Sequence, residues 1–315
     1  MRDLQHRLSA LGFDASADEP GVFGTATASA VRAFQDHRGL PLTGACDATT
    51  WEALVEAGWR LGDRPLYRTM PMLRGDDVAD LQRRLGAIGF DAGRVDGIFG
   101  PRTDRALTDF QRNYGLVADS ICGPATVGAL ARLGDRHLAP ASVVDVRERE
   151  RFRCGPRTLD GRIVVLAHAG GLDALTTSAA RHLRTAGATV QVVEHPDGSQ
   201  QAAQANDLDA DVFLSVAMAA SGDRCRVAYY RAPAGWESQA GRRLAELLHE
   251  AIAGRLPCDD RGITPMTIPV LRETRMAAVA LELAPATEVV AHTGDLAAAL
   301  PHVLEEWLKS FSDGS

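Results

Sequence analysis

Hydrophobic residues in the first part of the chain recur with the spacing of amphipathic helices. Between positions 78 and 88, four apolar residues lie three or four positions apart: Val78, Leu81, Leu85 and Ile88. This spacing places them on one face of an α-helix. Gly89 follows and is the type of residue that ends a helix. The same reasoning predicts two further short helices, over 103–110 and 126–133.

This pattern occurs twice. Leu4-Gln5 returns as Leu81-Gln82, and Phe34-Gln35 returns as Phe110-Gln111. The first pair is offset by 77 positions and the second by 76, so the length change falls in the loop 14–22, opposite 91–98. A length change confined to a loop is typical of duplicated units. We therefore predict two small all-α modules of three helices each: copy one (residues 1–58) and copy two (residues 74–134).

The residues between and after the two copies differ in polarity. Residues 59–73 are too apolar for a free linker, and we expect Trp59, Leu66 and Tyr67 to pack the two bundles together. Residues 135–157 are more polar and are predicted to form a linker. The charge run at 147–151 within it is typical of a solvated helix face.

From residue 162 onward, the pattern predicts alternating strands and helices. Residues 163–166 form a continuous apolar run, as expected for a strand buried on both faces of a sheet. Further strands are predicted at 190–193, 212–216, 225–230 and 278–283, and helices at 175–186, 200–208, 236–253 and 296–311. This alternation predicts a three-layer α/β domain with a mostly parallel sheet over 158–311.

Composition narrows the possible partners and location. The net charge of -7 gives no general electrostatic reason to bind nucleic acid. No apolar run approaches the roughly 20 residues that span a bilayer, so we expect no membrane span. The start of the chain carries no signal-peptide pattern, and the five cysteines show no CxxC spacing. We therefore expect a cytoplasmic protein with reduced thiols.

The repeated motifs resemble the peptidoglycan-binding domain 1 family. They read LQxxLxxxGF, DGxFGxxTxxALxxFQ and CGPAT, and they cover both copies nearly end to end. The resemblance implies that peptidoglycan or its precursors are the ligand. Copy two keeps the compact Asp-Gly turn that residues 18–21 replace in copy one, so we expect binding mainly at copy two. The candidate binding residues are exposed polar groups near that turn and the second helix: Asp96, Arg102, Gln111 and Arg112.

The C-terminal domain resembles the zinc-dependent N-acetylmuramoyl-L-alanine amidases of the Amidase_3 type. The resemblance rests on residues 163–171, 205–216 and 269–283. It implies a zinc ion held by His, Glu and His, and a separate Glu that acts as acid and base. Bound zinc lowers the pKa of a water molecule to about 7 and so provides a nucleophile for amide hydrolysis.

Position by position, the zinc ligands that the resemblance implies are missing. The two histidine positions hold Ala169 and Ala217, and the loop that carries the Glu ligand is absent. His168 lies one position before the first ligand position, and Asp173 is the only nearby carboxylate. The acid/base Glu persists as Glu282. We therefore predict no metal and no cofactor, with a vestigial Glu282.

Other histidines are not expected to restore the metal site. His182 falls within a predicted helix, and His195 and His292 fall in loops after strands. His195 is the one that could approach the strand ends. For all three, a solvent-facing position is the simpler interpretation, because single loop histidines are ordinary surface residues.

The combination of modules resembles the catalytically degenerate amidase-like proteins of actinobacteria. The resemblance implies a cytoplasmic regulator of peptidoglycan precursor synthesis, with the UDP-N-acetylglucosamine enolpyruvyl transferase as a partner. Our main hypothesis is a non-catalytic regulator or scaffold rather than an enzyme. One alternative is a zinc amidase with an altered site, which requires His168, Asp173 and Glu282, with or without His195, to converge. The other is a wall-binding protein acting outside the cell.

Overall fold

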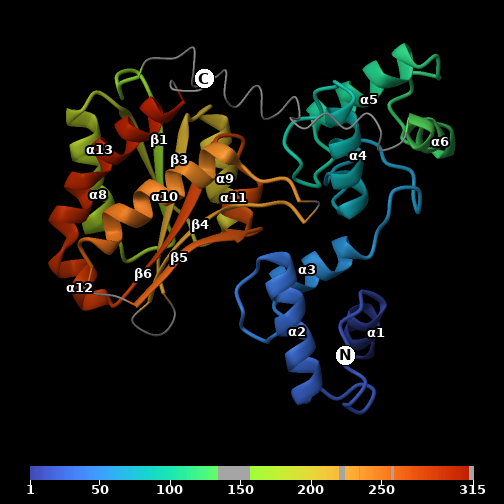
Figure 1. Cartoon of the computed structure of the whole chain (residues 1–315), viewed down its shortest axis with the longest axis horizontal. Helices are drawn as coiled ribbons and strands as arrows, with labels where there is room; N and C mark the ends of the chain where they lie inside the picture. The colour runs from blue at the N-terminus through green and yellow to red at the C-terminus, as the bar shows by residue number, and fades with distance from the viewer. Residues whose placement is uncertain (134–156, 220–223, 234, 257–258, 312–315) are drawn as a thin grey trace. The chain divides into compact units, whose positions relative to one another are not determined.

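The computed structural model describes residues 1–133, 157–219, 224–233, 235–256 and 259–311 (Figure 1). The chain divides into two compact units, and each is described by itself. The helical repeats lie in the first unit and the β-sheet lies in the second. Nearly all of the linker expected over 135–157, with its charge run, lies outside the described residues.

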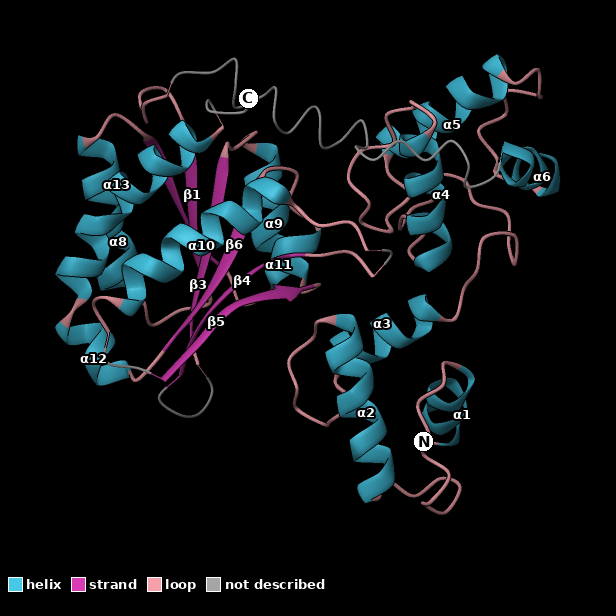
Figure 2. Cartoon of the chain, in the orientation of Figure 1, coloured by secondary structure: helices cyan, strands magenta, loops and turns pink. Residues whose placement is uncertain are grey.

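Each copy of the repeat contains three helices, as the sequence predicts. Copy one consists of α1 (Arg2–Ala10), α2 (Thr25–Arg38) and α3 (Ala48–Ala57). Copy two consists of α4 (Asp76–Ala87), α5 (Pro101–Asn113) and α6 (Pro124–Leu133). The helices are drawn in cyan in Figure 2. Each copy has its own apolar core, built around Phe34 in one and Phe110 in the other.

A glutamine near the start of each copy fastens the first loop to the second helix. In copy two, the Gln82 amide donates to Thr103 Oγ1 at 3.1 Å and to the Ile98 carbonyl at 3.0 Å. Its oxygen accepts from the Gly97 N–H at 2.9 Å. Gln5 makes the equivalent contacts in copy one. The two Leu-Gln motifs therefore encode the same internal network, although the two loops differ in length.

A second pair of glutamines fastens the second loop to the third helix. Gln111 donates to Asp119 at 2.9 Å and to Thr126 Oγ1 at 3.2 Å, and it accepts from the Ser120 N–H at 2.9 Å. Gln35 makes the corresponding bonds in copy one. Because buried amides must be hydrogen-bonded, these residues hold the modules together from inside.

The connector belongs structurally to copy two. Leu66 is fully buried in the core of copy two, and its backbone pairs with that of Cys122. The Leu73 carbonyl accepts from the Phe99 N–H at 2.9 Å. Tyr67, which we expected to pack the bundles together, is instead 44% exposed. The neighbours of a strand residue alternate in direction, so burying Leu66 turns Tyr67 outward.

One partly buried ion pair joins the two copies. Arg38 at the end of α2 contacts Asp76 at the start of α4 through two bonds, of 2.8 and 2.9 Å. The Arg38 side chain is 6% exposed. A carboxylate at a helix N-terminus and an arginine at a helix C-terminus are each favoured by the helix dipole. The pair therefore stabilises both helix ends while it links the copies.

The second unit contains a six-stranded sheet in the order β2-β1-β3-β6-β4-β5 (Figure 1). The strands are β1 (Ile163–His168), β2 (Thr189–Glu194), β3 (Val212–Met218), β4 (Arg224–Tyr230), β5 (Asp259–Met266) and β6 (Ala277–Leu283). Every neighbouring pair is parallel except β4 and β6. The predicted mostly parallel sheet is therefore confirmed.

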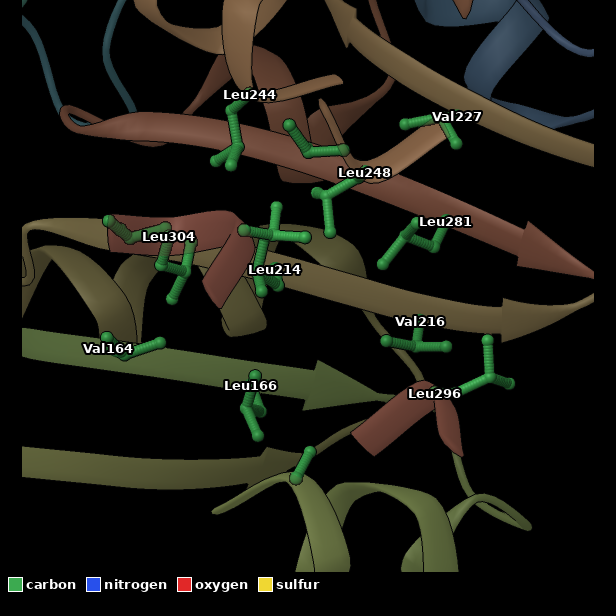
Figure 3. Close-up of a cluster of buried hydrophobic side chains, with 14 of the residues drawn as sticks. Val164, Leu166, Leu214, Val216, Val227, Leu244, Leu248, Leu281, Leu296 and Leu304 are labelled. Atoms are coloured by element: carbon green, nitrogen blue, oxygen red, sulfur yellow. The ribbon is translucent and has the colours of Figure 1, made fainter. Parts of the chain in front are cut away.

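Helices cover both faces of the sheet, which makes three layers. One face packs against α8 (Asp173–Thr185), α10 (Gln239–Ala253) and α13 (Thr293–Ser310). The other face carries α9 (Gly198–Asp207) and α11 (Pro269–Arg272), and α12 (Ala286–Ala291) precedes α13. In Figure 3, leucines from β1, β3 and β6 meet leucines of α10. This burial on both faces explains the continuous apolar runs of the central strands.

Three elements were not predicted: β5, α11 and α12. The β5 segment contains Gly262 and Pro265 and opens with two aspartates, so it shows none of the alternation that identifies a strand. It pairs only with β4, at the edge of the sheet, where such residues are tolerated. Helix α10 begins at Gln239 rather than at 236, because Ser238 caps it through the Gly241 N–H.

Candidate functional site

The carboxyl ends of three parallel strands bring the amidase-related positions to one edge of the sheet. In the register of the sheet, His168 of β1 lies opposite Val216 of β3, and Ala217 lies opposite Glu282 of β6. Ala169 follows directly after β1. Open α/β sheets bind ligands at this edge, so the residues that stand here decide what the domain can do.

The two positions where the resemblance implies zinc-binding histidines carry methyl groups. Ala169 and Ala217 are both exposed at the edge, and an alanine side chain has no lone pair to coordinate a metal. His168 is buried, and its Nδ1 accepts from the Gly170 N–H at 3.2 Å. Since zinc requires three or four protein donors, the residues present do not fit the zinc site that the resemblance implies.

Glu282 is held by an arginine from the antiparallel neighbour. Arg226 of β4 lies directly opposite Glu282 in the sheet. Its guanidinium nitrogens approach Glu282 Oε2 at 3.1 Å (Nε) and 2.5 Å (Nη2), and the two side chains are 16% and 35% exposed. The sequence contained no signal for this pair, because the direction of β4 is decided only by the assembled sheet. The arrangement compensates the charge of the Glu282 carboxylate.

A different group of potential ligands forms beside β1. His168 ends β1, Asp173 begins α8 and Glu194 ends β2, and one donor atom from each lies within 4.8 Å of the others. We did not predict Glu194. The available signal was its position at the end of a strand that neighbours β1. Donors held about 2.1 Å from a tetrahedral zinc ion are about 3.4 Å apart, so a spread of up to 4.8 Å is wider than a formed zinc site.

This group lies apart from Glu282. Strands β1 and β6 are separated by β3 in the sheet. Adjacent strands are about 4.8 Å apart, so the ends of β1 and β6 are separated by about 10 Å. Within the described residues, Glu282 is not part of the group of His168, Asp173 and Glu194 and contacts Arg226 instead.

The other histidines do not join the group. His195 Nδ1 accepts from the Asp197 N–H of its own loop at 3.0 Å. The ring nitrogens of His292 lie 3.5 Å from Glu288 and 3.7 Å from Asp295. His182 lies in the last turn of α8 and is half-buried. Within the described part of the chain, His168 is the one histidine that belongs to a potential metal-binding group.

The candidate binding residues of copy two are not one surface. Gln111, expected among the exposed groups, is 1% exposed and fully engaged inside the module, so that expectation was wrong. Asp96 accepts from Gln82 and from the Ile98 N–H, each at 2.8 Å. Its carboxylate therefore shapes the turn. Sequence motifs cannot distinguish a buried polar residue from an exposed one, because both recur at fixed positions.

The two arginines of the candidate set are exposed but distant from each other. Arg102 is 56% exposed and lies 3.5 Å from Asp91, and Arg112 is 66% exposed and lies 3.5 Å from Asp109. Ten residues of α5 separate them, which is about 15 Å along a helix. They therefore remain separate candidate contacts for an anionic or sugar ligand.

Two family models match this architecture, which is that of a peptidoglycan-related, amidase-like protein. A model described as "Putative peptidoglycan binding domain" matches residues 1–54 and 74–130. A model described as N-acetylmuramoyl-L-alanine amidase matches residues 172–289. The first model thus matches each copy of the repeat, and the second begins just after the turn that contains Ala169.

Similar proteins come from bacterial cell-wall metabolism. The chain is 35% identical over 302 residues to the N-acetylmuramoyl-L-alanine amidase CwlM of Mycobacterium tuberculosis, covering 86% of this chain and 71% of that protein. The chain therefore belongs to the family of this CwlM protein. It is also 31% identical over 156 residues to the N-acetylmuramoyl-L-alanine amidase CwlL of Bacillus licheniformis, covering 42% and 43% of the two chains.

Solved amidase structures are similar to part of the chain. The crystal structure of the N-acetylmuramyl-L-alanine amidase Ami1 from Mycobacterium smegmatis aligns with a TM-score of 0.42 and 16% identity, over 49% of this chain and 99% of that chain. No helix in the described residues is long and apolar enough to cross a bilayer.

Proposed function

We propose that the protein is a non-catalytic, amidase-like regulator or scaffold of peptidoglycan precursor synthesis. The observation that carries the proposal is the pair of alanines, Ala169 and Ala217, at the positions where zinc-binding histidines are required. A methyl group cannot coordinate zinc. Without the metal there is no activated water, and amide hydrolysis loses its nucleophile.

The Arg226–Glu282 ion pair supports the same proposal. Both bonds from Arg226 on the neighbouring strand are made to Glu282 Oε2, so this carboxylate is part of a cross-strand ion pair. In this position the pair stabilises the sheet edge, and the edge is available for recognition rather than for catalysis.

The partners that we propose follow from the modules and the family. Copy one and copy two would bind peptidoglycan or its precursors, since both match the peptidoglycan-binding model. The amidase-like unit would contact a synthesis enzyme, and the UDP-N-acetylglucosamine enolpyruvyl transferase is the candidate. Such a regulator would act in the cytoplasm, where the soluble precursors are made, and would need no cofactor.

Two measurements on the full chain test the proposal. The first is the release of new L-alanine amino groups from purified peptidoglycan in the presence of zinc, with CwlL of Bacillus licheniformis as the active control. We expect no release by the wild-type protein or by Glu282→Gln. The second is the transferase rate, which we expect to rise when the chain is added. Zinc-dependent release that disappears in Glu282→Gln would overturn the non-catalytic assignment.

The group of His168, Asp173 and Glu194 favours a second candidate, a zinc amidase with an altered site. In that case, the three side chains would have to close around the metal and act without Glu282. Chelator treatment and the Glu194→Gln variant would then abolish amino-group release, whereas Glu282→Gln would retain it. This pattern differs from both results described above, so one set of assays separates the candidates.

A further inference from the structure

The first unit contains a groove between the connector (residues 59–73) and two helices of copy two. Its volume is about 520 Å³, which is within the range of small-molecule sites. Helices α4 and α6 form two of its walls, and Leu11 and Ala57 of copy one complete its lining. We call it the connector groove; its lining includes Leu11, Trp59, Arg60, Asp80, Arg84 and Leu130. The groove therefore lies mainly in copy two, where the sequence predicts ligand binding.

The two helical walls differ in chemistry. Helix α4 contributes Asp76, Asp80 and Arg84, which are four positions apart and so share one face of the helix. Helix α6 contributes Val127 and Leu130, which are apolar. A groove that combines apolar surface with a few polar side chains is typical of a site for an amphipathic small molecule.

Trp59 supplies the aromatic surface of the connector groove, and its ring is held in place. The guanidinium carbon of Arg64 lies 4.4 Å from the centre of the ring. Arg64 is in turn bound by the fully buried carboxylate of Asp77, with Nε 2.7 Å from Oδ2. The indole N–H of Trp59 has no hydrogen-bond partner among the described residues. A fixed ring with an available N–H can pack against the apolar face of a sugar and donate to one of its oxygens.

The connector groove carries an excess of positive charge. Arg60 is exposed, and its guanidinium has no ion-pair or hydrogen-bond partner in the described part of the chain. The Asp63 carboxylate accepts from the backbone N–H of Arg60 instead, at 2.8 Å. Asp80 is shared by two arginines, Arg83 at 2.6 Å and Arg84 at 2.9 Å. The other lining aspartate is already neutralised by the ion pair between the copies. This charge favours a ligand that carries a carboxylate.

We propose that the connector groove binds an N-acetylmuramoyl peptide that carries a free carboxylate. The sugar ring packs on Trp59, and the carboxylate pairs with Arg60 and Arg84. The proposal rests on the proposed function, in which the modules bind peptidoglycan or its precursors. It adds the place of binding, the part of the ligand that is recognised and the residues that recognise it.

A titration of the full chain with N-acetylmuramoyl-L-alanine tests the proposal. Calorimetry at low salt should show saturable binding that weakens at least about fivefold in Trp59→Leu and in Arg60→Gln. The matched controls are Trp51→Leu and Arg105→Gln, which alter a second partly exposed tryptophan and a second exposed arginine outside the groove. Both controls should bind as the wild-type protein does.

Two analogues of the probe separate the two halves of the ligand. N-acetylmuramoyl-L-alaninamide lacks the carboxylate, and N-acetyl-L-alanine lacks the sugar. We expect each to bind at least about fivefold more weakly than the probe. Loss of the carboxylate should have little further effect in Arg60→Gln, because the variant and the analogue remove the same contact. Independent, additive losses would contradict the pairing of the carboxylate with Arg60.

The outcomes distinguish this site from the proposed function. Saturable binding that Trp59→Leu and Arg60→Gln both retain would overturn the connector groove but leave the affinity of the modules for wall fragments intact. Absence of binding by the wild-type protein would overturn both. Unfolding would not explain a loss in Arg60→Gln, because this side chain has no hydrogen bond or ion pair within the described residues. Thermal unfolding followed by circular dichroism checks this for each variant.

Competition identifies the source of the ligand. Purified peptidoglycan and a UDP-linked N-acetylmuramoyl peptide are each added to the protein with bound probe. Displacement by the first supports the proposal with the wall polymer as the source, and displacement by the second supports it with a soluble precursor as the source. Displacement by neither would overturn the proposal.

Discussion

In copy two, Phe99 lies fully buried beneath residues 66–74, whereas Phe23 at the same place in copy one is 40% exposed. Gln82 and Gln5 nevertheless share three bonds: each donates to a threonine and to a loop carbonyl, and each accepts from a glycine N–H. The glutamine bonds inside the module therefore do not depend on residues 66–74 covering the phenylalanine. The two copies share these bonds and differ in what packs against Phe99 and Phe23.

This difference distinguishes motif residues that hold the module together from exposed residues that could contact a ligand. The glutamines of the Leu-Gln and Phe-Gln motifs are the most recognisable features of the repeat. In copy two they are buried, and their amides bond to loops and threonines. A recognition role is therefore better sought among the exposed residues of the modules than among these buried glutamines.

Replacing the buried aromatic residue should give the largest difference between the copies. Phe99→Ala removes a side chain from a filled core and should lower the free energy of unfolding of copy two by about 3–5 kcal/mol. Phe23→Ala removes a partly exposed ring and should cost less than about 1 kcal/mol. Hydrogen exchange resolved to α4–α6 and to α1–α3 measures both. Equal losses in the free energy of unfolding would mean that Phe23 and Phe99 contribute equally to stability, and they would contradict the difference between the copies.

The buried glutamines should instead behave alike. Gln111→Ala and Gln35→Ala each leave several loop groups without a partner, and each should destabilise its own copy by about 2–3 kcal/mol. Hydrogen exchange of α5–α6 and of α2–α3 is the measurement. Gln200→Ala, an exposed glutamine of α9, serves as the control with little change. A large effect in one copy only would contradict the shared framework.

The ion pair between the copies should contribute less. Arg38→Met removes two bonds to Asp76 at a partly exposed interface and should cost about 1–2 kcal/mol, seen as faster exchange at the end of α2 and the start of α4. Arg7→Met breaks the exposed pair with Asp3 and should change stability by less than about 0.5 kcal/mol. Indistinguishable results for the two variants would mean that Arg38 does not hold the copies together.

The two equivalent cysteines should differ in reactivity with no change in stability. Burial, together with the charge of Asp77, raises the pKa of Cys122 to about 12, whereas half-buried Cys46 has a pKa raised by burial and by Asp47. A raised pKa lowers the thiolate fraction, so alkylation of Cys122 should be negligible below pH 10 while Cys46 reacts increasingly as the pH rises. Peptide mass spectrometry after iodoacetamide treatment measures both sites. Equal labelling would mean that the two thiols are equally accessible and would contradict the difference between the copies.

Most of the fold could be predicted from the sequence, because amphipathic periodicity and apolar runs are local properties. The repeat, its six helices and the central strands of the sheet follow from that pattern. The edge strand β5 could not be predicted, since its glycine, proline and charged residues carry no such pattern. The inverted direction of β4 could not be predicted either, because it depends on how the strands pair in the assembled sheet.

The candidate site divides in the same way. The sequence by itself determined that alanines, Ala169 and Ala217, stand at the two positions where the resemblance implies zinc ligands, because residue identity alone decides whether a side chain can coordinate zinc. Only the tertiary structure decided the surroundings of the remaining groups. It placed Arg226 against Glu282, brought Glu194 to His168 and Asp173, and buried Gln111 while leaving Phe23 uncovered. These contacts join residues that are far apart in the chain, so they form only when the strands and loops pack together.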